Sequence, residues 1–290
     1  MRKRFVTLPS VICLATFFII TSTAQALTVI LDFNDPAQAN TSDIFGNTVG
    51  TFDLIPYDLV EADRATLYNS IFNEVINDYY GIVSSDVNPL SPLAPGFELD
   101  IDFEIGDIGT PPVNGDAEYY YAQIGDAVSG PHTGSLGVAG GDVIRNVLGN
   151  GPNFGFAVGG VLGSIFTSTI QVLNASGLFQ ATHAVAGTLS HEIGHALSLD
   201  HMNVVGAVTQ TGLNPIMGTG AIDLANAARL VDREFSISGQ NAQNGGATQT
   251  HVAQLIGAIG LRAVVAVPEP STALPLLLLL GVLTLRRMRR

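Results

Sequence analysis

The sequence predicts a single α+β domain, and three observations support this fold class. Patterns typical of strands dominate the first half of the chain, and helical patterns are concentrated in the second half. No internal repeat divides the sequence. Between two terminal segments that have the pattern of processing signals, residues 27–267 form a body long enough to bury one core.

The first two elements follow from their apolar patterns. Residues 27–33 are apolar and β-branched, which predicts a buried strand. Residues 64–80 carry aromatic and aliphatic side chains at i, i+3 and i+4 spacing, which predicts an amphipathic helix that ends at Gly81. Residues 87–96 contain three prolines and are therefore expected to form a loop.

The clearest alternation in the chain covers residues 97–105. Apolar side chains point to one side and acidic side chains to the other, which predicts a half-buried strand with an acidic outer face. A calcium site (Ca2+) on this face is an alternative, although a solvated strand face is the more common cause of such a pattern. Residues 118–124, with three consecutive tyrosines, are a further strand candidate.

The second half of the body changes from glycine-rich to helical. Glycine is frequent in residues 125–164, which indicates strands and tight turns pressed against neighbouring backbone. This stretch contains no phosphate-binding glycine pattern. Helical patterns follow at 182–199, 221–234 and 249–260. The expected architecture is therefore a twisted mixed sheet followed by helices.

Residues 1–26 have the three parts of a secretory signal peptide. Basic residues at positions 2–4 precede an apolar run at 11–20, and Ala24-Gln25-Ala26 forms a cleavage signature of small residues. We expect cleavage after Ala26 and export of the body that follows. An N-terminal membrane anchor is the alternative, but the apolar run is shorter than the roughly 20 residues that span a bilayer.

Residues 268–290 carry a second three-part pattern. Pro268-Glu269-Pro270 precedes an apolar stretch, and four arginines close the chain: Arg286, Arg287, Arg289 and Arg290. In this order the parts resemble the PEP-CTERM sorting signal of Gram-negative bacteria. The resemblance implies a short transmembrane helix with transient inner-membrane anchoring, processing by an exosortase-type enzyme, and delivery to the cell surface or an exopolysaccharide matrix. An ordinary C-terminal membrane anchor is the alternative.

The charge of the body excludes some classes of partner, and its cysteine content excludes disulfide bonds. Residues 27–267 hold 24 acidic and 5 basic side chains, which gives a formal charge of −19. Nucleic acids and anionic lipid surfaces repel such a body, so neither is expected as a partner. The one cysteine, Cys13, lies in the signal peptide, so the exported body is expected to have no disulfide.

The residues that carry chemistry are concentrated in His191-Glu192-Ile193-Gly194-His195. Four residues apart on a helix, His191 and His195 lie one turn apart on the same face, and both imidazoles can reach one metal ion. Glu192 is rotated by about 100° from His191, next to the ion but free to act on a water molecule. The pattern arises by chance in roughly a few of a thousand chains of this composition, so it is a strong signal.

A third histidine, His201, follows His195 by six residues. With it the sequence resembles the metzincin zinc endopeptidases, whose signature is HExxHxxGxxH followed by a methionine turn, and most of all the matrixin version. The resemblance implies a metzincin-like fold with one catalytic Zn2+ ion. It also implies site residues and their roles, which are metal ligation by His191, His195 and His201, general base catalysis by Glu192, and a Met-turn at Met217.

Two positions depart from the family pattern, since Ser198 replaces the motif's glycine and no tyrosine follows Met217 as an extra ligand. The resemblance implies a protein or peptide substrate along an edge strand between residues 97 and 170. Two non-catalytic functions stay open, a zinc-stabilised surface or matrix protein and a lectin-like binder of exopolysaccharide. The remaining histidines are expected at the surface or at helix caps: His132, His183 and His251.

Overall fold

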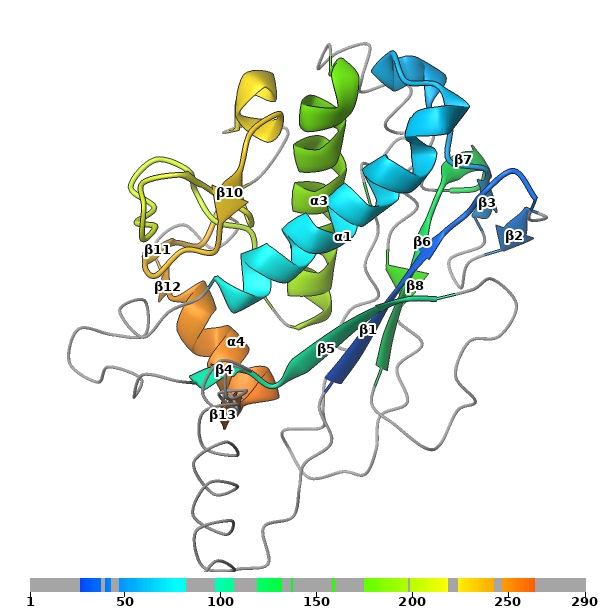
Figure 1. The fold of residues 1–290 in the computed structure, drawn as a ribbon. Coiled ribbons are helices and arrows are strands. Elements are labelled where there is room, and N and C mark those ends of the chain that lie inside the picture. The colour runs from blue at the N-terminus through cyan, green and yellow to red at the C-terminus, as the bar shows by residue number, and fades with distance from the viewer. Residues whose placement is uncertain are drawn as a thin grey trace, which may run out of the picture.

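The computed structural model of the 290-residue chain describes residues 27–37, 40–42, 47–81, 97–106, 119–131, 137, 158–159, 175–197, 199–218, 224–242 and 247–263. These residues form a mixed α/β structure with three α-helices and several small sheets (Figure 1). Among them, no helix combines the length and the apolar character needed to cross a membrane. The predicted signal peptide, the proline-bearing loop and the sorting signal with Pro268, Glu269 and Pro270 lie outside the described residues.

The largest sheet has four strands, in the order β5-β1-β6-β8. Its members are β1 (Leu27–Phe33), β5 (Ile101–Ile105), β6 (Tyr119–Ile124) and β8 (Val158–Gly159). Strand β1 has the predicted bounds, and it is buried along almost its whole length, as its continuous apolar run requires. All neighbouring strands in this sheet are parallel, whereas the sequence analysis expected a mixed sheet. Antiparallel pairs occur only in the smaller sheets of the described residues.

The described residues also form four smaller sheets. One has three strands, β2 (Thr41–Ser42), β3 (Thr48–Gly50) and β7 (Asp126–Ser129). Three have two strands each, which are β4 (Phe97–Leu99) with β13 (Leu261–Ala263), β9 (Asn214–Pro215) with β10 (Arg233–Glu234), and β11 (Gly239–Gln240) with β12 (Thr248–Gln249). Most of these strands are only two or three residues long, too short to show a period in the sequence.

The alternating stretch 97–105 forms two strands instead of the single one predicted. The chain changes partners at Asp100, whose N–H donates to the carbonyl of Gly260 at 3.1 Å. Before this point β4 pairs with β13, and after it β5 pairs with β1. On the acidic face, the Arg262 guanidinium binds the carboxylates of Glu98 at 2.8 Å and Asp102 at 2.5 Å. A guanidinium is therefore the partner of these two carboxylates.

Three α-helices occur in the described residues, α1 (Arg64–Tyr80), α3 (Gly177–Ala196) and α4 (His251–Ile259). Helix α1 has the predicted bounds and is capped by Gly81, whereas α3 begins five residues before its predicted start. The predicted helix at 221–234 is wrong. There the chain forms a short 3₁₀ turn (Asn226–Arg229) and then β10, because the backbone of β10 pairs with β9 and this pairing outweighs helix propensity. Two further 3₁₀ turns, Ile55–Tyr57 and Glu61–Asp63, precede α1.

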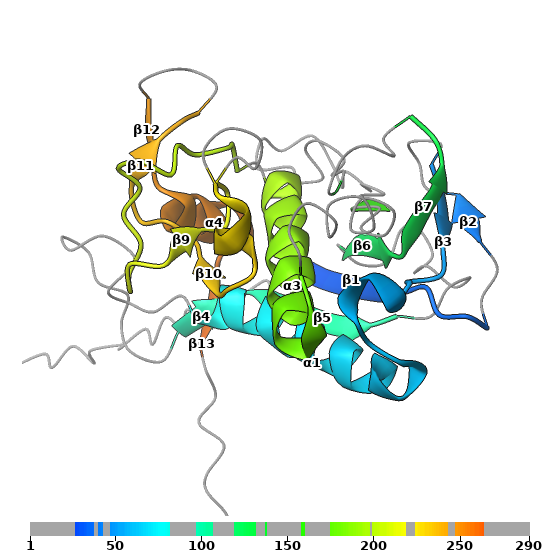
Figure 2. The same cartoon turned by 90° about the horizontal axis from the view of Figure 1, so that it is seen from above.

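Helix α3 lies between the parallel sheet and the C-terminal segments β9 to β12 and α4, as both views of the ribbon show (Figures 1 and 2). Helix α1 crosses α3 with a buried stripe that recurs every four residues, Leu67, Ile71, Val75 and Tyr79. Full burial of each such side chain contributes about 1.5–3 kcal/mol. The Tyr79 hydroxyl donates to the carbonyl of Ser190 at 3.1 Å, and its ring contacts Phe103 and Phe235. One tyrosine thus joins α1, α3, the sheet and the C-terminal segments.

Gly187 in α3 provides the space for a buried arginine. Arg233 is only 5% exposed, and a Cβ atom at Gly187 would lie 2.7 Å from both its Cζ and Nε atoms. We therefore expect Gly187→Ala to lower the free energy of unfolding by about 1–3 kcal/mol through overpacking. Gly257→Ala in α4 is the matched control, since its Cβ would meet no atom within 4 Å. The control should gain up to about 1 kcal/mol from helix propensity. Equal denaturant midpoints for the two variants would contradict the close packing of Arg233 on α3.

Candidate metal centre

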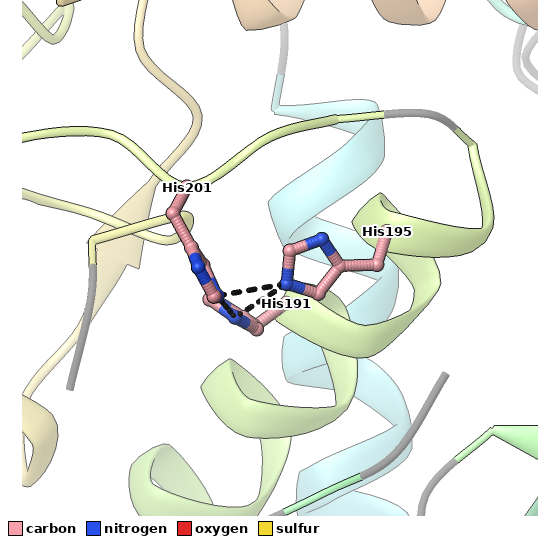
Figure 3. A group of neighbouring side chains, drawn as sticks. All are labelled: His191, His195 and His201. Atoms are coloured by element: carbon pink, nitrogen blue, oxygen red, sulfur yellow. Dashed lines mark hydrogen bonds between the residues drawn. The ribbon is translucent and has the colours of Figure 1, made fainter. Parts of the chain in front are cut away.

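The structure brings the three predicted metal ligands together. His191 and His195 project from the last turns of α3, and His201 faces them from the chain that follows the helix (Figure 3). The Nε2 atom of His195 lies 3.0 Å from that of His191 and 3.0 Å from that of His201. The Nε2 atoms of His191 and His201 are 3.2 Å apart. This group could bind one metal ion.

Backbone carbonyls determine which ring nitrogens are available to a metal. The Nδ1 atom of His191 lies 2.8 Å from the carbonyl oxygen of Ile216, and that of His195 lies 2.8 Å from the carbonyl oxygen of Leu199. A carbonyl oxygen only accepts, so both Nδ1 atoms carry the proton and donate it. The Nε2 atoms of the neutral rings then hold lone pairs that face each other, an arrangement that repels unless a cation lies between them.

The spacing of the nitrogens fits a zinc-sized ion. Zinc binds imidazole nitrogen at about 2.0–2.1 Å, so two nitrogens on one tetrahedral ion are roughly 3.3 Å apart. The observed separations of 3.0–3.2 Å are close to this value. Burial lowers the pKa of all three imidazoles, and it lowers that of His191 well below its usual range. At neutral pH the rings are therefore in the neutral form that binds metals.

The segment around His201 is held on two sides. The carbonyl oxygen of His201 accepts hydrogen bonds from the Nε2 atom of Gln249 and from the N–H of Ala242, both at 2.9 Å. The next residue, Met202, donates its N–H to the carbonyl of Met217 at 2.9 Å. Ser198, which replaces the glycine of the motif, lies outside the described residues. The anchored segment nevertheless places His201 beside the other two histidines.

Met217 lies against the helix between the two histidines of α3. Its side chain is fully buried, and a Cβ atom at Gly194 would lie 2.6 Å from its sulfur. The preceding residue, Ile216, supplies the carbonyl that accepts from His191. The turn at residues 216–217 therefore both packs under the helix and fixes the orientation of one predicted ligand.

Glu192 is buried on α3, close to Gly137. It is 7% exposed, and a Cβ atom at Gly137 would lie 2.7 Å from its Oε1 atom. Burial and then the charge of Glu192 raise the pKa of Tyr120 on β6. The Tyr120 hydroxyl is buried and has no hydrogen-bond partner among the described residues. Sequence reasoning placed Tyr120 on a strand and Gly137 in a glycine-rich stretch, but it did not connect either residue with Glu192.

Of the remaining histidines, His251 departs from the expected surface position. His251 is completely buried at the start of α4, with its Nδ1 atom 2.9 Å from the hydroxyl of Ser236, so a surface position is wrong for it. Burial lowers its pKa to about 4. His183 contacts Glu74 across the α1–α3 interface. His132 lies outside the described residues.

Comparison with known proteins identifies no relative of this chain. No protein-family model matches the chain, and a search of the curated proteins finds no match.

Proposed function

We propose that the chain is an exported zinc-dependent endopeptidase of the metzincin type. The observation that carries this proposal is the meeting of three neutral imidazoles, from His191, His195 and His201, next to a buried glutamate on the same helix. A purely structural zinc site has no need of a carboxylate beside the metal, whereas hydrolysis needs a base there. Export and cell-surface delivery rest on the terminal segments of the sequence alone.

In the proposed reaction His191, His195 and His201 would hold the metal through their Nε2 atoms. Zinc at such a site lowers the pKa of a bound water to about 7 and polarises the peptide carbonyl. Glu192 accepts a proton from the attacking water and then transfers it to the leaving amine. The carbonyls of Ile216 and Leu199 keep His191 and His195 in the required tautomer during this cycle.

An extended substrate would bind beside the sheet. Among the described strands, the four-stranded sheet ends in β5 on one side and β8 on the other. Of the two edges, β8 lies next to α3. We therefore place the substrate backbone along β8, where it can add a strand to the sheet and present its scissile bond to Glu192.

Chelation separates this function from its alternatives. The purified full-length protein should cleave an unfolded protein substrate such as casein, lose the activity in the presence of a zinc chelator, and regain it when Zn2+ is restored. Bound zinc without cleavage of any protein would favour a zinc-stabilised surface or matrix protein instead. In that case retention on an exopolysaccharide resin would identify the lectin-like function.

A further inference from the structure

A second group of metal-ligating side chains lies away from the three histidines. It consists of Glu74 on α1, His183 on α3 and Asp232 just before β10. Their ligand atoms all lie within 4.8 Å of one another. The Nδ1 atom of His183 is 2.8 Å from the Oε1 atom of Glu74, and the ring of Phe179 packs edge-on against the imidazole at 4.3 Å. Three segments far apart in the sequence thus supply one imidazole and two carboxylates to one place.

Two of these side chains, Glu74 and Asp232, border an accessible pocket. It has a volume of about 280 Å³, and its lining includes Glu74, Asp78, Asp232, Arg233 and Glu234. Water can therefore reach an ion held by the group and complete its coordination. The side chain of Arg233 is 5% exposed, and its Nε and Nη2 atoms have no acceptor among the described residues. Water around a bound ion would supply acceptors for these two N–H groups.

The charges in the pocket lining are unbalanced. Four carboxylates line it, and Arg233 is the one arginine or lysine among the described lining residues. Glu234 is already bound by the N–H groups of Thr211 and Leu213, at 2.8 Å and 3.3 Å. Asp78 accepts a hydrogen bond from the hydroxyl of Ser190 at 2.5 Å. The carboxylates of Glu74 and Asp232 lie close to each other beside His183, and a divalent cation between them would offset their mutual repulsion.

We propose that Glu74, His183 and Asp232 bind a second divalent transition-metal ion, of the zinc type. An imidazole ligand favours such a metal over calcium or magnesium, which prefer oxygen ligands alone. Two ligand atoms on one zinc ion are roughly 3.3 Å apart, so the 2.8 Å pair needs to open by only about half an ångström.

The second ion links three parts of the fold. It joins α1 and α3 to the segment that leads into β10, and β10 pairs with β9, which ends two residues before Met217. We therefore assign the ion a structural role, in which it stabilises the packing of the segment that contains Met217. This inference does not depend on peptidase activity.

Zinc stoichiometry tests the proposal on the full-length protein. Wild type, stripped by chelator and dialysed against Zn2+, should hold two ions per chain, and Asp232→Asn or Glu74→Gln should hold one. Glu104→Gln, which removes an exposed carboxylate on β5, is the matched control and should keep two. Asp232 is itself exposed, so its asparagine variant is expected to fold, and the far-UV circular dichroism spectrum checks this.

A second arm isolates the new site from the first. In the variant His191→Ala/His195→Ala, calorimetric titration with Zn2+ should still show one ion per chain, and adding Asp232→Asn should weaken this binding at least about 100-fold. Absence of Zn2+ binding in His191→Ala/His195→Ala, or Zn2+ binding that is unchanged by Asp232→Asn, would overturn the proposal. If wild type binds two ions but does not cleave casein, the result would count against the peptidase function alone.

Discussion

Glu192→Gln is expected to reduce the kcat for peptide hydrolysis by about 10³-fold while the zinc content at the three histidines stays unchanged. The amide has nearly the shape of the carboxylate, but it cannot accept the proton of the attacking water. Because Glu192 is buried against Gly137, a shorter side chain would also open a cavity, which makes glutamine the cleaner substitution. The measurement is steady-state cleavage of a quenched fluorescent peptide, together with metal analysis of the same sample.

Glu104→Gln is the matched control for this experiment. It removes one carboxylate from an exposed position on β5 and should leave kcat within about twofold of wild type. Turnover at the wild-type rate in Glu192→Gln would remove Glu192 from the mechanism. Loss of activity together with loss of zinc would show that Glu192 acts on metal binding and not on proton transfer.

His191→Ala is expected to abolish both high-affinity zinc binding at the three-histidine centre and detectable hydrolysis. It removes one of three protein ligands and leaves the carbonyl oxygen of Ile216 without its donor. We expect the affinity for zinc at this centre to fall by at least about 100-fold, and kcat/KM to fall by about 10³-fold or more. Competition with a chromogenic chelator measures the first quantity, and the peptide assay measures the second.

Chelated wild type is the control that separates metal loss from misfolding. It should regain activity when Zn2+ is restored, whereas His191→Ala at the same zinc concentration should not. If excess Zn2+ rescues the variant completely, two histidines suffice for catalysis and the role of His191 as a ligand is wrong.

The elements that could be predicted are those whose own pattern determines them. Strand β1 has the predicted bounds because its apolar run is continuous, and helix α1 has them because its pattern is long and periodic. The region 221–234 could not be predicted, because its backbone partners belong to β9 and lie outside any local pattern. The division of residues 97–105 into two strands at Asp100 has the same cause. The backbone hydrogen bond from Asp100 to Gly260 interrupts a stretch whose alternation is continuous in the sequence.

Some residues of the candidate sites could likewise be predicted from local sequence, and others could not. His191, Glu192 and His195 are neighbours on one helix, so their spacing alone predicts one site. The second group was missed because His183 and Glu74 are 109 residues apart, and only the packing of α1 on α3 brings them together. The contact of Gly137 with Glu192 likewise follows from tertiary structure and from no feature of the sequence around either residue.

The burial of α3 on both sides limits the substitutions that this helix can accept. Thirteen of its 20 residues are buried, whereas a helix on a protein surface buries only one stripe. Gly187 and Gly194 are surrounded by the side chains of Arg233 and Met217, so a larger residue at either position requires a compensating change elsewhere. Sequence divergence should therefore be slow along the whole helix and not only at the histidines and the glutamate. Neutral drift should concentrate on the exposed positions of α1, where few neighbours constrain the side chain.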